Sequence, residues 1–287
     1  MKLFVFGLGY SALHFVRENR HLATSGTVRA PAAAASLRAE GIEAFPFDGA
    51  RGEPWLAEAL GQADLLLVSA PPSASGDPVL LTYEHEILAS PGLKRVLYLS
   101  TVGVYGGADG AWVDERAPVR AVSPRGKWRI DAEAQWLALG RARNTPVDVL
   151  RLAGIYGPGR NALEKLRDGT ARRIVKPGQV FNRIHVVDIA GVLGRLIEAE
   201  GPGGIWNVAD REPAPPQDVI AFAAELLGLP PPPEEPYETA EMSPMARSFY
   251  SDNRRVSTEK LKNVLGYVWR YPTYREALRD MAGAPGR

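Results

Sequence analysis

The first residues whose types and spacing could do chemistry are small ones near the start of the chain. They lie directly after the apolar run at residues 3–6, in the segment Gly7-Leu8-Gly9-Tyr10-Ser11-Ala12. Between a strand and a helix, this pattern gives a tight turn at the first glycine, room for a pyrophosphate at the second, and close helix packing at the alanine. The helix N–H groups would face the phosphates. We expect a dinucleotide site made by Gly7, Gly9, Tyr10, Ser11 and Ala12.

A charged residue follows the next predicted strand. NAD sites usually carry an acidic residue about 20 residues after the glycines, where it binds the ribose 2′-hydroxyl. This chain has Arg29 there, after Thr27 and Val28. A guanidinium pairs well with a 2′-phosphate. Arg29 therefore predicts NADP in preference to NAD, although a solvated turn residue would look the same.

Four further residues follow predicted strands whose carboxyl ends should meet the cofactor. Asp48 comes after the third strand and could contact the adenine edge. Ser69, Ala70 and Pro71 come after the fourth and should pass beside the cofactor. Each could equally be structural.

The elements that would position these residues alternate along the chain. Apolar runs predict strands, and helical spacing with proline or glycine at the ends predicts helices between them. The strands are expected at 3–6, 24–29, 42–47, 64–68, 95–99 and 147–152, and the helices at 12–19, 32–40, 54–60, 80–89 and 123–143. This order predicts an α/β fold, a Rossmann-like doubly wound parallel sheet.

Glycine and proline become frequent from Gly154 onward. We therefore expect an NAD(P)-binding domain over 1–153 and a smaller, interleaved α+β substrate region over 154–287. Its helices are expected at 187–198, 217–227, 257–265 and 274–281. The proline-rich segment 230–236 predicts an extended surface connection.

Four segments carry a resemblance to a known family. They are Ser100-Thr101-Val102-Gly103-Val104-Tyr105-Gly106, the stretch LRLAGIYGPGR at 150–160, RIHVVDIA at 183–190, and IWNVAD at 205–210. In this order they resemble the extended short-chain dehydrogenase/reductase superfamily, which includes nucleotide-sugar epimerases and dehydratases. The resemblance implies the same Rossmann fold and a nicotinamide cofactor.

One departure concerns the family's Tyr-x-x-x-Lys pair, in which tyrosine transfers a proton and lysine holds the nicotinamide ribose. The matching positions here are Arg125 and Arg129. Arg125 cannot replace the tyrosine, because a guanidinium keeps its proton at working pH. Arg129 could still donate to a ribose hydroxyl. The chain thus resembles atypical members that have lost the pair.

The resemblance also suggests residues for the reaction and the substrate. Thr101 would bind the substrate oxygen, with Ser100 beside the cofactor, and Tyr105 is the nearest phenol. The alternatives are a hydroxyl that caps the strand end and a tyrosine that packs. Substrate contacts are expected from Arg160, Arg183 and His185, which could instead form ion pairs or a buried structural imidazole.

Composition excludes several other classes. Thirty-four Lys plus Arg and 33 Asp plus Glu leave a net charge of +1, so no nucleic-acid partner is expected. There is no cysteine, and the four histidines lack ligand spacing, so no metal site is expected. No apolar run suits a signal peptide or a membrane helix, and we expect a cytoplasmic protein.

These observations predict an NADP-binding oxidoreductase, or an enzyme similar to epimerases and dehydratases, with an altered proton-transfer group. Its substrate would be a small carbonyl or alcohol compound, with nucleotide-linked and phosphorylated compounds among the candidates. The alternatives are a non-catalytic NADP-binding redox sensor or scaffold, and an interaction module that binds no cofactor. By resemblance, the helices at 80–89 and 123–143 could form a homodimer seam.

Overall fold

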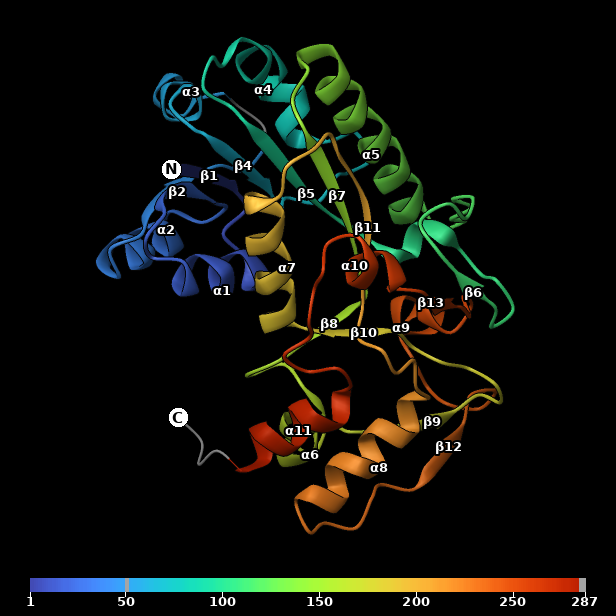
Figure 1. Ribbon diagram of the computed structural model, residues 1–287. Helices are drawn as coiled ribbons and strands as arrows, with labels where there is room; N and C mark the ends of the chain where they lie inside the picture. The colour runs from blue at the N-terminus through green and yellow to red at the C-terminus, as the bar shows by residue number, and fades with distance from the viewer. Residues whose placement is uncertain (50–51, 284–287) are drawn as a thin grey trace. The chain divides into compact units, whose positions relative to one another are not determined.

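A seven-stranded sheet forms the centre of the N-terminal part of the chain, in the order β11-β7-β5-β4-β1-β2-β3 (Figure 1). The computed structural model describes residues 1–49 and 52–283, so the last four residues of the expected substrate region lie outside it. The strands are β1 (Lys2–Phe6), β2 (Ala23–Val28), β3 (Glu43–Pro46), β4 (Leu65–Val68), β5 (Arg95–Thr101), β7 (Val147–Leu152) and β11 (Gly203–Val208). All four pairs from β5 to β3 are parallel.

Helices cover both faces of this sheet (Figure 1). They are α1 (Tyr10–Glu18), α2 (Pro31–Ala39), α3 (Pro54–Gly61), α4 (Pro78–Ala89), α5 (Pro124–Arg143) and α7 (Val186–Glu198). On one face, Phe4 and Phe6 of β1 pack in a core with Trp136 of α5 and with residues of α3 and α4. Because side chains alternate along a strand, Leu3 and Val5 face the helices on the other side. The expected Rossmann-like fold is confirmed.

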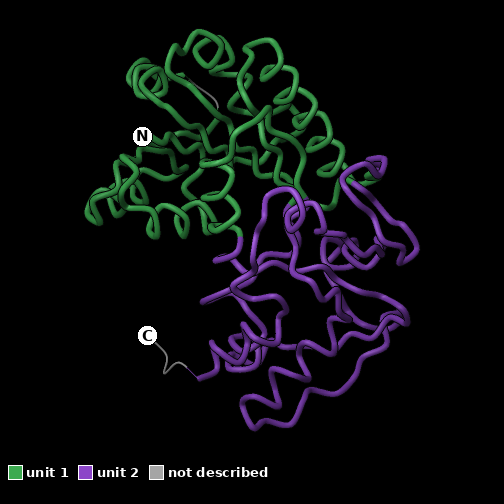
Figure 2. The backbone as a smooth tube through the Cα atoms, viewed as in Figure 1, with its two compact units in different colours: residues 1–104, 121–151, 189–206 green, residues 105–120, 152–188, 207–287 purple. Residues whose placement is uncertain are grey.

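The chain forms two compact units, each made of several segments (Figure 2). Unit 1 comprises residues 1–104, 121–151 and 189–206, and contains the sheet. Unit 2 comprises residues 105–120, 152–188 and 207–287. The chain passes between the units at several points, one of them between Arg151 and Leu152. The expected interleaved regions at 1–153 and 154–287 stay a prediction.

The residues of unit 2 that the structure describes form three short parallel strand pairs. They are β6 (Trp112–Val113) with β13 (Arg255–Val256), β8 (Gly154–Tyr156) with β10 (Arg183–His185), and β9 (Arg173–Val175) with β12 (Glu234–Pro236). Its helices are α6 (Ala162–Arg167), α8 (Pro216–Leu226), α9 (Pro244–Phe249), α10 (Glu259–Asn263) and α11 (Tyr274–Gly283). Val219, Ala223 and Leu278 join the core between α8 and α11.

The proline-rich segment differs from its expectation. The sequence predicts only an extended connection, but Glu234–Pro236 pairs with Arg173–Val175 as a strand. Proline at position 236 is tolerated because a two-stranded pair leaves an edge free. Among the described residues, no helix is long and apolar enough to span a membrane.

Candidate functional site

The turn after β1 requires glycine at position 7. Gly7 has φ +92°, and its N–H donates to Thr27 Oγ1 at 3.1 Å. A Cβ there would lie 3.0 Å from the backbone nitrogen of Ala70. Any side chain would be strained and would push against the chain that follows β4. The conformation fits the role expected of the first glycine.

Gly9, unlike Gly7, lies in open surroundings. It is the exposed N-cap of α1, it offers no side-chain cap, and a Cβ there would meet nothing within 4 Å. The first turn of a helix leaves N–H groups without helical partners, which favours an anion. Ser11 and Ala12 are buried and Tyr10 is half-buried, so the first two would contribute mainly backbone N–H groups. This turn fits a pyrophosphate.

The chain that follows β4 lies against the same turn. The N–H groups of Ser69 and Ala70 both donate to the carbonyl of Phe6, at 2.8 and 3.0 Å. Ser69 and Ala70 are half-buried and Pro71 is exposed. The structure thus brings the residues after β1 and β4 together at one edge of the sheet.

Arg29 and Asp48 follow the neighbouring strands β2 and β3. Val28 and Pro46 are register partners, so both segments leave the sheet at its carboxyl edge. Arg29 and Asp48 are both exposed. Arg29 forms no ion pair with any residue of 1–49 or 52–283. Its guanidinium is therefore available to an anionic group.

The end of β5 holds two hydroxyl residues with different surroundings. Thr101 is half-buried, and its Oγ1 accepts a hydrogen bond from Gly103 N–H at 3.1 Å. That oxygen can still donate its own proton. Ser100 is buried and donates to Glu133 of α5. The Ser100 hydroxyl is thus engaged within the protein, and its expected cofactor contact remains a prediction.

Glu133 and Arg151 are important residues that the sequence did not single out. Arg151 Nη2 donates to Glu133 Oε2 at 2.8 Å, and both side chains are 5% exposed. With Ser100 they form a buried polar group between α5, β5 and β7. Arg151 lies in the LRLAGIYGPGR segment, and the resemblance of that segment to the family was the only sign in the sequence that Arg151 matters.

Arg129 reaches the same end of β5. Its Nη1 donates to the Leu99 carbonyl at 2.5 Å and to the Tyr98 hydroxyl at 3.1 Å. Tyr98 is fully buried, and burial raises the pKa of its hydroxyl. Nε and Nη2 of Arg129 form no hydrogen bond within the described chain, so they remain available as donors. Arg125, one turn earlier, is exposed.

Tyr105 belongs to unit 2 and is 3% exposed. Its hydroxyl donates to Asn207 Oδ1 at 2.7 Å. Asn207 in turn donates its backbone N–H to Glu115 at 2.9 Å. Tyr105 is therefore held in a packed polar contact, as in the alternative interpretation of this tyrosine. Its role as an acid remains a prediction.

The three expected substrate residues lie in different surroundings within unit 2. Arg183 donates to the carbonyls of Phe181 and Ala214 at 2.9 and 3.0 Å. His185 is 2% exposed, and its Nδ1 accepts from the Val187 N–H at 3.3 Å. The exposed Arg160 follows β8, with its backbone paired to Gly157. Their expected contacts with substrate stay a prediction.

Asp188 is a further buried residue near His185 in sequence. It accepts hydrogen bonds from the Tyr267 hydroxyl, Arg270 N–H and Tyr271 N–H, at 2.8, 2.7 and 3.1 Å. Burial nevertheless raises the pKa of its carboxyl group. The RIHVVDIA segment thus contains a residue that fixes the chain before α11.

Comparisons with known proteins agree with this fold. Residues 80–209 match the model of the NAD dependent epimerase/dehydratase family. Protein YeeZ of Escherichia coli K12 is 30% identical over 252 residues, covering 81% of this chain and 85% of that protein.

Two further relatives are similar over most of the chain. The structure of a functionally unknown conserved protein from Silicibacter pomeroyi DSS is 46% identical, covers 98% of this chain and 97% of its own, and has a TM-score of 0.90. The 3-diazoavenalumate denitrifying reductase of a Streptomyces species is 26% identical over 74% of this chain and 75% of its own. The expected resemblance is confirmed, and the chain belongs to the NAD dependent epimerase/dehydratase family.

Proposed function

We propose that this protein is an NADP-dependent oxidoreductase that reduces a small molecule at the carboxyl end of β5. The observation that carries the proposal is the position of Arg129, whose guanidinium reaches this strand end and keeps donors available. Thr101 adds a hydroxyl at the same strand end. Both belong to unit 1, which also contains the glycine turn.

The glycine turn after β1 and Arg29 after β2 are the features that would bind the cofactor. NADP would be held by backbone N–H groups after Gly9 and by Arg29 at its 2′-phosphate. When bound, it would supply a hydride. The absence of a carboxylate at the end of β2 favours NADP over NAD, which lacks that phosphate.

The donors near β5 favour reduction over oxidation. Oxidising an alcohol requires a base to remove the hydroxyl proton, and Arg129 cannot act as one. Adding a hydride to an unsaturated group instead creates negative charge, which a guanidinium and a hydroxyl stabilise. Water can then supply the proton. The reductase name of the Streptomyces relative supports this direction.

Titration calorimetry tests the cofactor. The full chain, Arg29→Ala and the control Arg20→Ala, which removes another exposed arginine of unit 1, are titrated with NADPH and NADH. We expect the wild-type chain to bind NADPH more tightly than NADH. Arg29→Ala should weaken NADPH binding at least about tenfold, and Arg20→Ala should leave the NADPH affinity unchanged. If neither cofactor binds the wild-type chain, the proposal is wrong.

A redox sensor is the second candidate, because the Tyr105 hydroxyl is already bonded to Asn207 and neither Arg125 nor Arg129 can release a proton. NADPH oxidation with a panel of aldehydes, ketones and nitrogen-containing acceptors separates the two functions. Oxidation that depends on an acceptor supports the reductase. Tight NADPH binding without any oxidation supports the sensor.

A further inference from the structure

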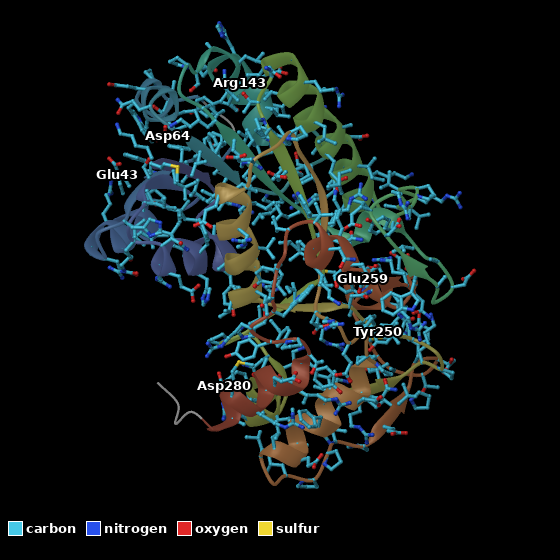
Figure 3. The ribbon with its side chains drawn as sticks, in the orientation of Figure 1. Glu43, Asp64, Arg143, Tyr250, Glu259 and Asp280 are labelled. Atoms are coloured by element: carbon cyan, nitrogen blue, oxygen red, sulfur yellow. The ribbon has the colours of Figure 1, made fainter. Side chains whose placement is uncertain are left out.

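Unit 2 contains an aromatic and cationic group that none of the roles above uses. Lys176 Nζ and Arg247 Cζ each lie 5.0 Å from the centre of the Tyr237 ring. The Tyr250 ring, labelled in Figure 3, lies 5.3 Å from that of Tyr237. We call Lys176, Tyr237, Arg247 and Tyr250 the Tyr237 cluster.

The two cations of the Tyr237 cluster are held by neutral groups. Lys176 donates to the Tyr250 carbonyl, and Arg247 donates to the Ala240 carbonyl at 2.8 Å. Neither forms an ion pair with a residue that the structure describes. Since both lie over one ring, they are within about 10 Å of each other, roughly one Debye length, and they repel.

Three other arginines of unit 2 each have a carboxylate partner. The pairs are Arg172 with Glu235, Arg173 with Glu234, and Arg254 with Asp252. Glu238 and Glu241, which lie between Tyr237 and Arg247 in the sequence, are exposed and form no ion pair in the described chain. Lys176 and Arg247 thus lie over one tyrosine ring without a carboxylate partner in the described part of the chain.

We propose that the Tyr237 cluster is an anion site that binds the carboxylate or phosphate group of a small molecule. Lys176 and Arg247 are half-buried, so their charges are screened less than those of exposed side chains. Each has N–H donors beyond those that bond the carbonyls. An oxyanion would relieve their repulsion and accept charge-assisted hydrogen bonds. This anion site belongs to unit 2 alone and does not depend on the proposed function.

Ligand-observed NMR on the full chain tests the proposal. Inorganic phosphate and benzoate are titrated at constant ionic strength, with benzamide as the neutral analogue of benzoate. The variants are Lys176→Gln and Arg247→Gln, and Lys262→Gln removes an equal charge from an exposed position of unit 2. We expect saturable binding of at least one anion, weakened about tenfold by either cluster variant and unchanged by Lys262→Gln.

Every outcome bears on the proposal. Binding of phosphate alone, or of benzoate alone, supports the site and identifies which group it takes. Absence of saturable binding, equal binding of benzamide, or equal weakening in Lys262→Gln overturns it. NADPH titration of the same variants is expected to give unchanged affinity, so failure of the cofactor proposal is seen separately from failure of the anion site.

Discussion

Arg151 on β7 and Glu133 on α5 form a buried ion pair that ties the helix to the sheet. Hydrogen bonds join them, with Arg151 Nη2 at 2.8 Å and Nε at 3.2 and 3.3 Å from the carboxylate oxygens. Ser100 on β5 donates to the same carboxylate. The pair therefore orients the end of β5, where the reaction is proposed.

Removing one partner of this pair should destabilise the fold strongly. In Glu133→Gln the Arg151 charge stays buried without a counter-charge, so the free energy of unfolding should fall by about 3–5 kcal/mol. Urea denaturation of both proteins measures the difference. The exposed pair of Arg17 and Glu40 is the control, and Glu40→Gln should cost under about 1 kcal/mol. Equal losses in the two variants would contradict the role assigned to Glu133.

The two glycines of the turn after β1 should respond differently to alanine. Gly7→Ala must hold a Cβ at φ +92° and 3.0 Å from Ala70 N, so it should lose about 1–3 kcal/mol of stability. Gly9→Ala meets no atom within 4 Å and should change stability by less than about 0.5 kcal/mol. It should nevertheless weaken NADPH binding, because its Cβ would occupy the space proposed for the pyrophosphate. Denaturation and calorimetry on each variant measure both effects, and unaltered NADPH affinity in Gly9→Ala would exclude this position of the phosphates.

Arg129 should contribute to cofactor affinity, since its available donors lie at the end of β5. Arg129→Met should weaken NADPH binding about tenfold, the effect of losing one charge-assisted hydrogen bond. Arg125→Met, which changes an exposed arginine of the same helix, serves as the control. Calorimetry below the unfolding temperature of each variant separates binding from stability. If both variants bind NADPH equally well, Arg129 does not contact the cofactor.

The central sheet was predictable because its signals are local. The runs at 3–6, 64–68 and 95–99 are apolar at every or nearly every position, as expected of strands buried on both faces. The glycine turn is also local, since Gly7 and Gly9 need only their own backbone conformations. These elements therefore appear in the structure close to their expected bounds.

Other features depend on partners far along the chain. Ser100 contacts Glu133 only because α5 packs against β5, and no spacing in the sequence predicts that contact. The pairing of β9 with β12 joins strands of three residues separated by about 60 positions, too short to show a two-residue period. For the same reason the sequence could not show that Lys176 and Arg247 approach the same tyrosine ring.

Stability should also depend on pH through Asp64, which is labelled in Figure 3. Its carboxylate accepts from Lys94 Nζ and from the Lys2 backbone N–H, both at 2.8 Å, and the hydrogen bond from Lys94, with a smaller contribution from Lys2, lowers its pKa. A carboxyl whose pKa is lower in the folded state stabilises the fold above its unfolded pKa, about 3.9, and loses that effect as the pH falls through the folded value.

Asp64→Asn removes this titration while keeping the size of the side chain. Near neutral pH the variant should be less stable than the wild type by under about 1 kcal/mol, because the ion pair with Lys94 is largely exposed. The difference should shrink as the pH is lowered below about 4, since the wild-type carboxyl then becomes neutral as well. Urea denaturation at a series of pH values between neutrality and about pH 3 measures the trend. A difference that stays constant or grows on acidification would show that Asp64 acts through its shape and hydrogen bonds and not through its charge.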